Sequence, residues 1–317
     1  MNESQGTDLS KQRIAVLFPC YNEEATIADC VASFRAALPQ ASIYVYDNNS
    51  KDATRQRAKA AGAIVRNEPQ QGKGNVMRRM FADIEADIYV LADGDNTYHA
   101  PSAPKMIAML IEENLDMVAG ARVPDDSDAA YRRGHQFGNF MLTWFVSFLF
   151  GNRFTDMLTG YRVFSRRFIK SFPAMAAGFE TESELTIHAL SLGLPVAEIA
   201  TPYGARPEGS HSKLSTYKDG LRILRAIVTL FKDERPLAFF SLLAGALAIA
   251  AIVLIVPVIA YFLQTGLVPR LPTAVMSASL MVLSFLSLAC GMILDTVSTG
   301  RREVKRLHYL HYKAPKS

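Results

Sequence analysis

The sequence has 317 residues, of which 50% are hydrophobic and 20% are charged. That length and composition suit one large or two ordinary folded domains and exclude a disordered tail or a disulfide-stapled miniprotein. With 34 Lys and Arg against 30 Asp and Glu, the net charge of +4 gives no reason to expect nucleic acid as a partner. The three cysteines, Cys20, Cys30 and Cys290, have no paired spacing, which argues against disulfides and structural zinc.

Residues 1–12 are polar and contain no apolar signal segment, so we expect them to be disordered and the next segment to fold in the cytoplasm. From residue 13 onward, short apolar runs alternate with stretches of helical periodicity. Strands are expected at 14–18, 42–47, 62–66, 87–92 and 116–121, and helices at 27–38, 52–61, 73–85 and 102–113. This alternation predicts an α/β domain over residues 13–232 with a parallel sheet covered on both faces. In such sheets, ligands bind beyond the carboxyl ends of the strands.

A stretch from Gly134 to Asn152 contains no charged residue. Polar and small residues crowd its ends and leave an apolar centre of about a dozen residues, which is short for a membrane span. The pattern favours a helix near 136–151 that lies in the membrane interface or packs in the core. Trp144, the only tryptophan, suits the headgroup level or an ordinary core position equally.

The last third of the chain has two long uncharged stretches, 237–263 and 271–294, joined by a short turn. Their lengths predict a transmembrane hairpin over residues 233–296. Basic residues flank its outer ends, which places both ends on the cytoplasmic side of the inner (plasma) membrane. The basic tail, 297–317, is expected to lie against anionic headgroups or to be solvated. Small residues in the spans suit close contact within the hairpin or between copies of the chain in a homo-oligomer.

Acidic groups follow three of the expected strands. Glu23 follows the first strand, Asp47 ends the second, and Asp93 and Asp95 follow the fourth. No G-x-G-x-x-G turn follows any early strand, which disfavours a nicotinamide enzyme. Two carboxylates separated by one residue can together bind a hard divalent cation, Mn²⁺ or Mg²⁺. Such a cation could neutralise a diphosphate leaving group.

Four segments carry a resemblance to a known family: PCYNEE (19–24), YDNNSKD (46–52), QGKGNVMRRM (71–80) and DGDNTY (93–98). They resemble glycosyltransferase family 2, which has the GT-A nucleotide-sugar-binding fold. Three later segments, 156–167, 178–185 and 206–220, are most similar to the polyprenyl-phosphate glycosyltransferases of the dolichol-phosphate mannose synthase-like subgroup. The resemblance covers nearly all of the chain. It implies an inverting transfer of a sugar from a nucleotide sugar to a polyprenyl phosphate such as undecaprenyl phosphate, with a UDP-sugar preferred and GDP-mannose as the competitor.

The resemblance also implies roles for particular residues. The nucleotide sugar would be bound by Pro19, Tyr21, Asn22, Glu23, Asp47, Lys73, Asp93 and Gly94. Asp93 and Asp95 would also hold the metal. Many relatives read D-x-D-x-Q, whereas Thr97 stands at the last place here, so the third metal ligand is not identified. The acceptor phosphate would be bound by Arg206, Ser210, Ser212 and Lys213, with Arg122, Arg132 and Arg133 as further cations.

The catalytic base has several candidates. A lipid phosphate monoester, with a second pKa of about 6, is already anionic near neutral pH and needs little help from a base. By resemblance, Asp156 is the base or an acceptor-orienting residue. Glu182 and Glu184 compete for that role, and helical spacing predicts that one of the two faces inward. Cys20 is expected to be an inert buried thiol.

Three other functions are weighed against this one. A processive polysaccharide synthase usually carries Q-x-x-R-W, but Thr143 precedes the only tryptophan, and two spans are few for a polymer channel. A non-catalytic, membrane-anchored nucleotide-sugar-binding protein would not need Asp93 and Asp95 intact. A nucleotidyltransferase would release pyrophosphate and need no lipid acceptor.

Overall fold

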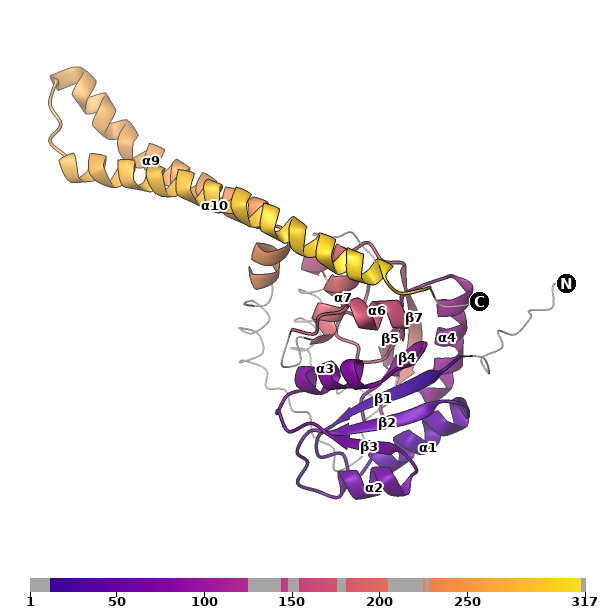
Figure 1. Ribbon diagram of the computed structural model, residues 1–317. Helices are drawn as coiled ribbons and strands as arrows, with labels where there is room; N and C mark the ends of the chain where they lie inside the picture. The colour runs from indigo at the N-terminus through magenta and orange to yellow at the C-terminus, as the bar shows by residue number, and fades with distance from the viewer. Residues whose placement is uncertain are drawn as a thin grey trace. The chain divides into compact units, whose positions relative to one another are not determined.

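The computed structural model describes residues 12–124, 144–147, 154–175, 181–204, 225 and 228–314 (Figure 1). The chain forms two compact units, which we call unit 1 (residues 1–223 and 305–317) and unit 2 (residues 224–304). The described part of unit 1 contains one sheet of seven strands, in the order β3-β2-β1-β4-β6-β5-β7. These are β1 (Ile14–Cys20), β2 (Ser42–Asp47), β3 (Ile64–Asn67), β4 (Ile88–Leu91), β5 (Met117–Pro124), β6 (Arg162–Ser165) and β7 (Val196–Tyr203).

The helices of unit 1 alternate with these strands along the chain. They are α1 (Ile27–Ala37), α2 (Thr54–Ala60), α3 (Lys73–Asp83), the short η2 (Ala100–Ser102), α4 (Ala103–Glu112), α6 (Arg166–Ser171) and α7 (Thr181–Ser191). Every strand and helix expected from the sequence between residues 14 and 121 is present, with ends that differ by a few residues. All strand pairs are parallel except those of β6, which runs antiparallel to β4 and β5. The predicted α/β fold with a mostly parallel sheet is therefore confirmed.

The central strands β1, β4 and β6 of the sheet are buried on both faces. Alternate residues of β1, such as Val16 and Phe18, belong to one core cluster with α1 and α4, where Phe18 meets Phe34 edge-on at 5.2 Å. Successive side chains of a strand point to opposite faces, so Leu17 faces the other side, where α3 packs against β1. Because neither face of these central strands is free, the polar side chains at the strand ends are the ones that can meet a ligand.

One edge of the sheet collects the expected site residues. The strands β1, β2 and β4 run parallel and end at this edge. Since β6 is antiparallel, its first residue, Arg162, pairs with Leu91 at the end of β4. The segment that precedes β6 therefore reaches the same edge as the carboxyl ends of the parallel strands.

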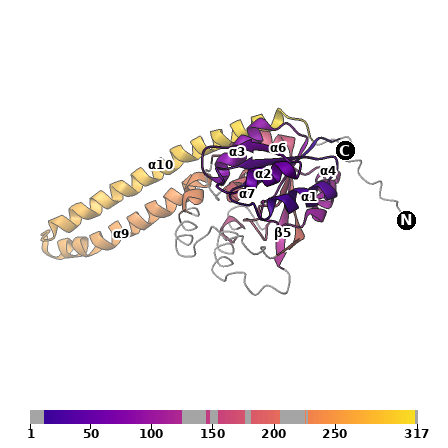
Figure 2. The same cartoon turned by 90° about the horizontal axis from the view of Figure 1, so that it is seen from below.

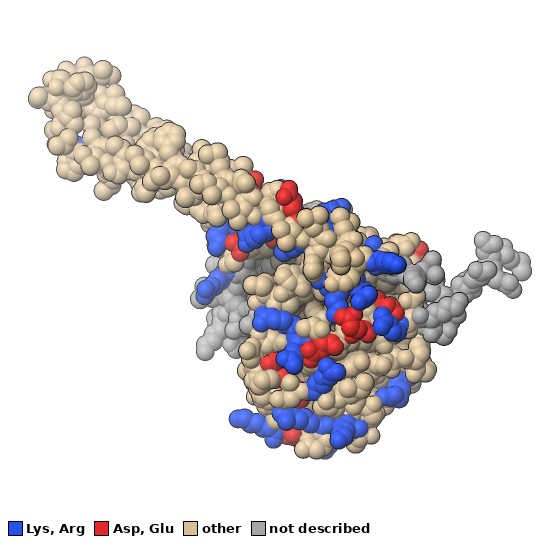
Figure 3. Space-filling model, viewed as in Figure 1, with Lys and Arg blue, Asp and Glu red and all other residues tan. Residues whose placement is uncertain are grey.

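Unit 2 contains α9 (Pro236–Thr265) and most of α10 (Leu271–Leu310), which lie side by side in both cartoon views (Figures 1 and 2). Only 17% of the most apolar 18-residue segment of α9 is buried, and only 22% of that of α10. The two helices are therefore not core helices of a globular unit. Their length and composition allow each to cross a membrane. Figure 3 shows the visible face of the pair almost without charged side chains over most of its length.

Small residues form the seam between α9 and α10. Ser277, Ser284 and Gly291 recur every seven residues on α10 and are buried. The hydroxyl of Ser277 donates to the Ala251 carbonyl oxygen, and that of Ser284 to the Ala244 carbonyl oxygen, both at 2.8 Å. In a membrane, helix pairs are held by this kind of close packing and by interhelical hydrogen bonds.

Part of the expected basic tail, 297–317, is helical in the structure. The helix α10 continues to Leu310, and residues from 305 onward belong to unit 1. There the Tyr309 hydroxyl donates to Asp116 Oδ2 at 2.8 Å, and the Arg167 guanidinium lies 4.9 Å from the centre of the Tyr309 ring. The many charged residues of this segment suggest a polar tail. However, the rings of Tyr309 and Tyr312 pack against Arg167 and Arg166, and the apolar stems of long charged side chains also supply packing surface.

The helix expected near 136–151 falls mostly outside the described residues. Residues 144–147 are helical, and the Trp144 side chain is 61% exposed. Trp144 is therefore not a core aromatic residue of unit 1.

Candidate active site at the strand ends

The loops after β1 and β2 are joined to each other by hydrogen bonds. The backbone N–H of Asn22 donates to Ser50 Oγ, and the N–H of Lys51 donates to Asn22 Oδ1, both at 2.9 Å. Asn22 has a φ of 53°, a left-handed conformation that asparagine tolerates better than most residues. The Glu23 N–H donates to Thr54 Oγ1 at 2.9 Å. The PCYNEE and YDNNSKD segments are thus held together, with Pro19 and Tyr21 half-buried beside them.

Asp47 ends β2 and is completely buried. Its Oδ2 accepts a hydrogen bond from Arg55 Nε at 2.6 Å, whereas its Oδ1 has no partner within the part of the chain that the structure describes. A buried carboxylate oxygen that lacks a donor is costly. Asp47 Oδ1 is therefore suited to accept a hydrogen bond from a ligand.

Gly72, the residue before α3, is held in place by the side chain of Asn48, which follows β2. Asn48 Nδ2 donates to the carbonyl oxygens of Glu68 and Gln70, and Asn48 Oδ1 accepts from the Gly72 N–H at 2.7 Å. Gly72 has a φ of 131°, which side-chain-bearing residues rarely adopt. This arrangement sets where α3 begins and hence where Lys73 points.

Lys73 joins two carboxylates from distant parts of the chain. Its Nζ lies 2.5 Å from Asp93 Oδ1, after β4, and 2.5 Å from Glu182 Oε1, in the first turn of α7. Burial by itself lowers the pKa of Lys73, but the negative charges of Asp93 and Glu182 outweigh it and raise the pKa above its usual value. Lys73 is therefore a charged bridge inside the site.

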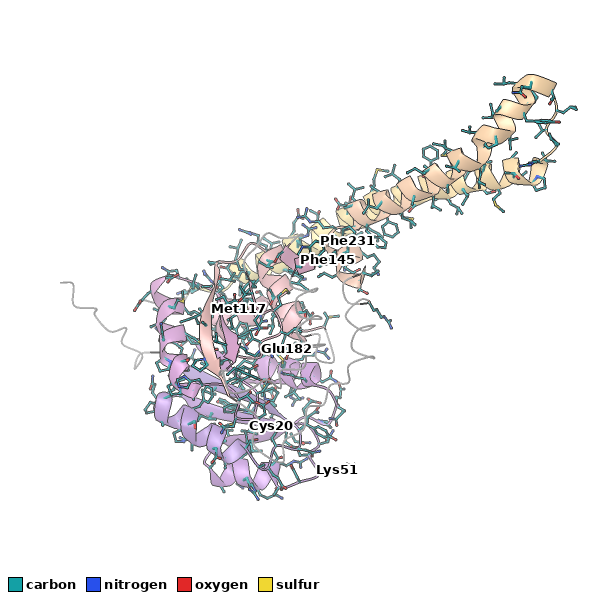
Figure 4. The ribbon with its side chains drawn as sticks, turned by 180° about the vertical axis from the view of Figure 1, so that it is seen from behind. Cys20, Lys51, Met117, Phe145, Glu182 and Phe231 are labelled. Carbon is teal, nitrogen blue, oxygen red and sulfur yellow. The ribbon has the colours of Figure 1, made fainter. Side chains whose placement is uncertain are left out.

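The two oxygens of Glu182 have different surroundings. Oε1 pairs with Lys73, whereas Oε2 is buried and has no partner among the described residues. The residue as a whole is 5% exposed, and Figure 4 shows it in the interior of unit 1. Glu184 is half-buried, and its Oε1 accepts a hydrogen bond from the Met175 N–H at 2.9 Å. Of the two glutamates, Glu182 is the one at the strand-end site.

The Asp93–Gly94–Asp95 turn is packed tightly. A Cβ on Gly94 would lie 2.6 Å from Cys20 Sγ, so only glycine fits there. Asp95 is 4% exposed, and its Oδ1 accepts a hydrogen bond from Thr97 Oγ1 at 2.7 Å. Asp93 remains 29% exposed. The turn thus presents one carboxylate toward solvent and keeps the second just beneath it.

The carboxylates at this edge are possible ligands of a divalent cation. Within the described residues, no group of three or more His, Cys, Asp or Glu side chains could hold a metal by itself. Two carboxylates are nevertheless a sufficient protein contribution for an ion that takes its other ligands from a diphosphate and water, as Mg²⁺ commonly does. Asp93 and Asp95 therefore fit a cation that is shared with the substrate.

Asp156 and Arg122, both singled out from the sequence, form a pair. Arg122 Nε lies 2.6 Å from Asp156 Oδ2, and its Nη2 lies 2.8 Å from Oδ1, so the ion pair is bidentate. Glu198, in β7, accepts the Asp156 N–H at 2.9 Å and the Thr155 N–H at 2.7 Å. Sequence reasoning did not identify Glu198, because no motif marks this position.

Two further residues that the sequence did not single out organise the loop before β6. The Tyr98 hydroxyl accepts the Gly160 N–H at 2.8 Å, and burial raises the pKa of Tyr98 well above its ordinary value. Arg162 is completely buried and donates to the Thr159 carbonyl oxygen and to Thr186 Oγ1. Burial lowers the pKa of Arg162 to about 10. Tyr98 and Arg162 connect this loop with the DGDNTY segment and with α7.

Some expected site residues are not placed. Arg206, Ser210, Ser212 and Lys213, together with Arg132 and Arg133, lie outside the described residues. Cys20 is buried beneath Gly94, and this burial raises the pKa of its thiol well above the usual value. That agrees with an inert side chain.

The mostly parallel sheet with carboxylates at its strand ends defines an α/β nucleotide-sugar-binding fold of the GT-A type. Residues 15–172 match the family model "Glycosyl transferase family 2". Glycosyltransferase AglJ of Haloferax volcanii is 31% identical over 299 residues, which cover 94% of this chain and 98% of AglJ. The chain therefore belongs to glycosyltransferase family 2.

Two other relatives are informative. The dolichyl-phosphate hexose transferase of Haloferax volcanii is 27% identical over 229 residues, which cover 72% of this chain and 98% of the relative. The crystal structure of glucosyl-3-phosphoglycerate synthase from Mycobacterium tuberculosis, in complex with Mn²⁺, UDP and glucosyl-3-phosphoglycerate, has a TM-score of 0.57 and 25% identity. That comparison covers 72% of this chain and 81% of the synthase. The chain is thus a family 2 glycosyltransferase with hexosyltransferase relatives.

Proposed function

We propose that this protein transfers a sugar, with inversion, from a UDP-sugar to a polyprenyl phosphate at the cytoplasmic face of the membrane. The observation that carries the proposal is the cluster of Asp93, Lys73 and Glu182 at the end of β4, in a chain that also contains two apolar helices long enough to cross a bilayer. The UDP and Mn²⁺ complex of the mycobacterial synthase supports the donor. The name of the dolichyl-phosphate hexose transferase supports the acceptor.

On the donor side, the unpartnered Asp47 Oδ1 accepts a hydrogen bond from the base or ribose. We assign Pro19, Tyr21, Asn22, Glu23 and Gly94 to further contacts with the nucleotide sugar. Asp93 and Asp95 would hold Mn²⁺ or Mg²⁺, which supplies positive charge to the diphosphate when it is bound. Lys73 keeps Asp93 in place and adds a cation beside the leaving group.

On the acceptor side, Arg122 presents a planar guanidinium that suits a phosphate. Both oxygens of Asp156 already accept hydrogen bonds from Arg122, so we assign Asp156 to orienting this arginine and not to removing a proton. The acceptor phosphate is anionic near neutral pH, and its oxygen attacks the anomeric carbon while the bond from that carbon to the diphosphate breaks. We assign further phosphate contacts to Arg206, Ser210, Ser212 and Lys213.

The membrane arrangement follows from the apolar helices and their flanks. We propose that α9 and α10 cross the inner (plasma) membrane as a hairpin, with unit 1 in the cytoplasm. Basic residues stand at the outer ends of the pair, whereas Arg270 is the one charge in the turn between them. A lipid acceptor and an anchored enzyme then meet at one surface.

The test is a transfer assay with the full chain purified in detergent. Undecaprenyl phosphate, Mn²⁺ or Mg²⁺ and a panel of UDP-sugars and GDP-mannose are supplied, and mass spectrometry detects glycosylated lipid phosphate. We expect one singly glycosylated product, and a loss of about 100-fold or more in Asp93→Asn. Asp83→Asn, at the other end of α3 from Lys73, is the matched control: it weakens the partly exposed ion pairs with Arg66 and Arg79 and the hydrogen bond from Tyr46, and it should retain activity.

Other outcomes point to other functions. A ladder of products would indicate a processive synthase, and pyrophosphate release from a nucleoside triphosphate would indicate a nucleotidyltransferase. Free UDP without a lipid product would contradict the acceptor but keep the transferase. If Asp95→Asn supported full biological function in cells, a non-catalytic anchor would replace the proposed enzyme.

A further inference from the structure

The ion pair with Lys73 uses only one of the two carboxylate oxygens of Glu182. Oε2 is buried and has no hydrogen-bond partner within the described residues. An ionised carboxylate accepts hydrogen bonds at both oxygens, so an unmatched buried oxygen carries an energetic cost. A ligand that supplies an O–H or N–H there would remove that cost.

The position of Glu182 limits which part of the ligand it can meet. Lys73 Nζ is 2.5 Å from Glu182 Oε1 and 2.5 Å from Asp93 Oδ1, so these two carboxylates are immediate neighbours. In the proposed function, Asp93 faces the diphosphate of the donor, and the sugar is attached to the end of that diphosphate. Glu182 is therefore next to the sugar, and Asp47, at the end of β2, is next to the nucleoside.

The charges around this position also matter. Three described cations at this edge pair with carboxylates: Lys73 with Asp93 and Glu182, Arg122 with Asp156, and Arg55 with Asp47. The buried guanidinium of Arg162 also interacts with the charge of Glu182, but its hydrogen bonds go to the Thr159 carbonyl oxygen and to Thr186 Oγ1. The three carboxylates of Asp93, Asp95 and Glu182 thus outnumber the two described cations Lys73 and Arg162. An additional negative charge on the sugar would be repelled in this partly dehydrated space.

We propose that Glu182 is a specificity-determining residue: its Oε2 accepts a hydrogen bond from a donor-sugar hydroxyl, and its charge selects neutral sugars over uronic acids. The inference rests on the proposed function, because it takes the donor to be a UDP-sugar. A hydroxyl can donate to the carboxylate, whereas an ionised uronate has lost the proton at its carboxyl group and repels Glu182. Lys73 acts as a positioning residue that holds Oε1 and leaves Oε2 for the sugar.

Binding measurements test this inference without an acceptor. Calorimetry on the full chain in detergent with Mn²⁺ compares UDP, UDP-glucose and UDP-glucuronate. We expect the wild type to bind UDP-glucuronate at least about tenfold more weakly than UDP-glucose. In Glu182→Gln, which keeps the shape and removes the charge, that ratio should fall to about threefold or less, with UDP affinity unchanged. Glu184→Gln is the matched control and should keep the wild-type ratio.

The result that overturns the inference is equal affinity of the wild type for the two sugars, or a ratio that Glu182→Gln leaves unchanged. If Glu182→Gln does not fold, Glu182→Asp retains the charge beside Lys73 but withdraws it from the sugar. Glu182→Asp should weaken the binding of UDP-glucose about tenfold and leave the binding of UDP unchanged. An equal loss of affinity for both ligands would contradict the inference. Selective binding of UDP-glucose, without a lipid product in the transfer assay, would support the role of Glu182 in sugar selection but contradict a polyprenyl phosphate as the acceptor. Absence of UDP binding would contradict the proposed function and this inference with it.

Discussion

Gly160 sets the space available to Asp93. A Cβ at this position would lie 2.7 Å from Asp93 Oδ2 and 3.2 Å from the Tyr98 hydroxyl oxygen. We therefore expect Gly160→Ala to displace the Asp93 carboxylate. Small displacements of reacting groups can cost about 100-fold in rate, and we expect a loss of that order in sugar transfer. The measurement is the initial rate of lipid glycosylation, with thermal unfolding recorded in parallel.

A second glycine provides the control for this experiment. A Cβ on Gly204 would have as its nearest neighbour the Thr97 carbonyl oxygen at 3.9 Å, which is an ordinary contact. Gly204→Ala should therefore leave both the transfer rate and the unfolding midpoint nearly unchanged. A full transfer rate in Gly160→Ala would show that Asp93 does not need its present position.

The charged residues of the candidate site show which of its features can be predicted from the sequence and which cannot. Asp47, Asp93 and Asp95 are predictable because each stands where an apolar run ends. The bridge from Lys73 to Glu182 is not predictable, since it joins two helices that are far apart in the chain. The pairing of Arg122 with Asp156 depends in the same way on a strand order that no local pattern states.

At the scale of elements, the α9–α10 seam depends on small side chains. A Cβ on Gly291 would lie 2.8 Å from Phe240 Cβ and 3.6 Å from Leu237 Cα. Gly291→Val should force the helices apart and destabilise the hairpin by about 1–3 kcal/mol. Denaturant unfolding in detergent, followed by circular dichroism, measures this loss.

Gly245, on α9, is the matched control for Gly291. A Cβ there would have no heavy atom within 4 Å outside its own helix. Gly245→Val changes the backbone preference of a helix in the same way but adds no clash. Equal destabilisation by the two valines would contradict the seam, because backbone preference alone would then account for both.

Elements with strong local periodicity were predictable from the sequence, and those defined by pairing were not. The nine segments expected between residues 14 and 121 form because strand and helix periods alternate there without interruption. The reversed direction of β6 is decided by hydrogen bonds to β4 and β5, which the RVFS sequence does not encode. The polar end of α10 has no apolar run that would indicate a helix, so the sequence predicts only a basic tail over residues 297–317.

At the scale of the whole molecule, the C-terminal segment contributes to the surroundings of a buried histidine. His188, in α7, is 2% exposed and packs edge-on against Phe168 and Phe172 of the α6 region, with ring centres 5.3 and 5.4 Å away. Its Nε2 lies 3.1 Å from Ser171 Oγ. Burial, with a smaller contribution from the positive charge of Lys305, lowers the pKa of His188 to about 3.

This lowered pKa makes the stability of unit 1 depend on pH. Above about pH 6.5, His188 is neutral in both the folded and the unfolded chain, and it adds no pH dependence. Between about pH 6.5 and 3, the unfolded chain binds the proton and the folded chain does not, so the free energy of unfolding falls as the pH falls. At pH 5 the expected loss from this residue is about 2 kcal/mol relative to pH 7.

Denaturant unfolding of the full chain at pH 7 and pH 5 measures the loss, and His188→Gln isolates the contribution of the histidine. Glutamine can still bond to Ser171 but takes up no proton in this range, so the variant should lose about 2 kcal/mol less than the wild type between the two pH values. The variant can be less stable than the wild type at pH 7 without affecting this difference. If both proteins lose the same stability, His188 binds a proton equally readily in the folded and unfolded chains, and the acid sensitivity of unit 1 arises from its other titratable groups.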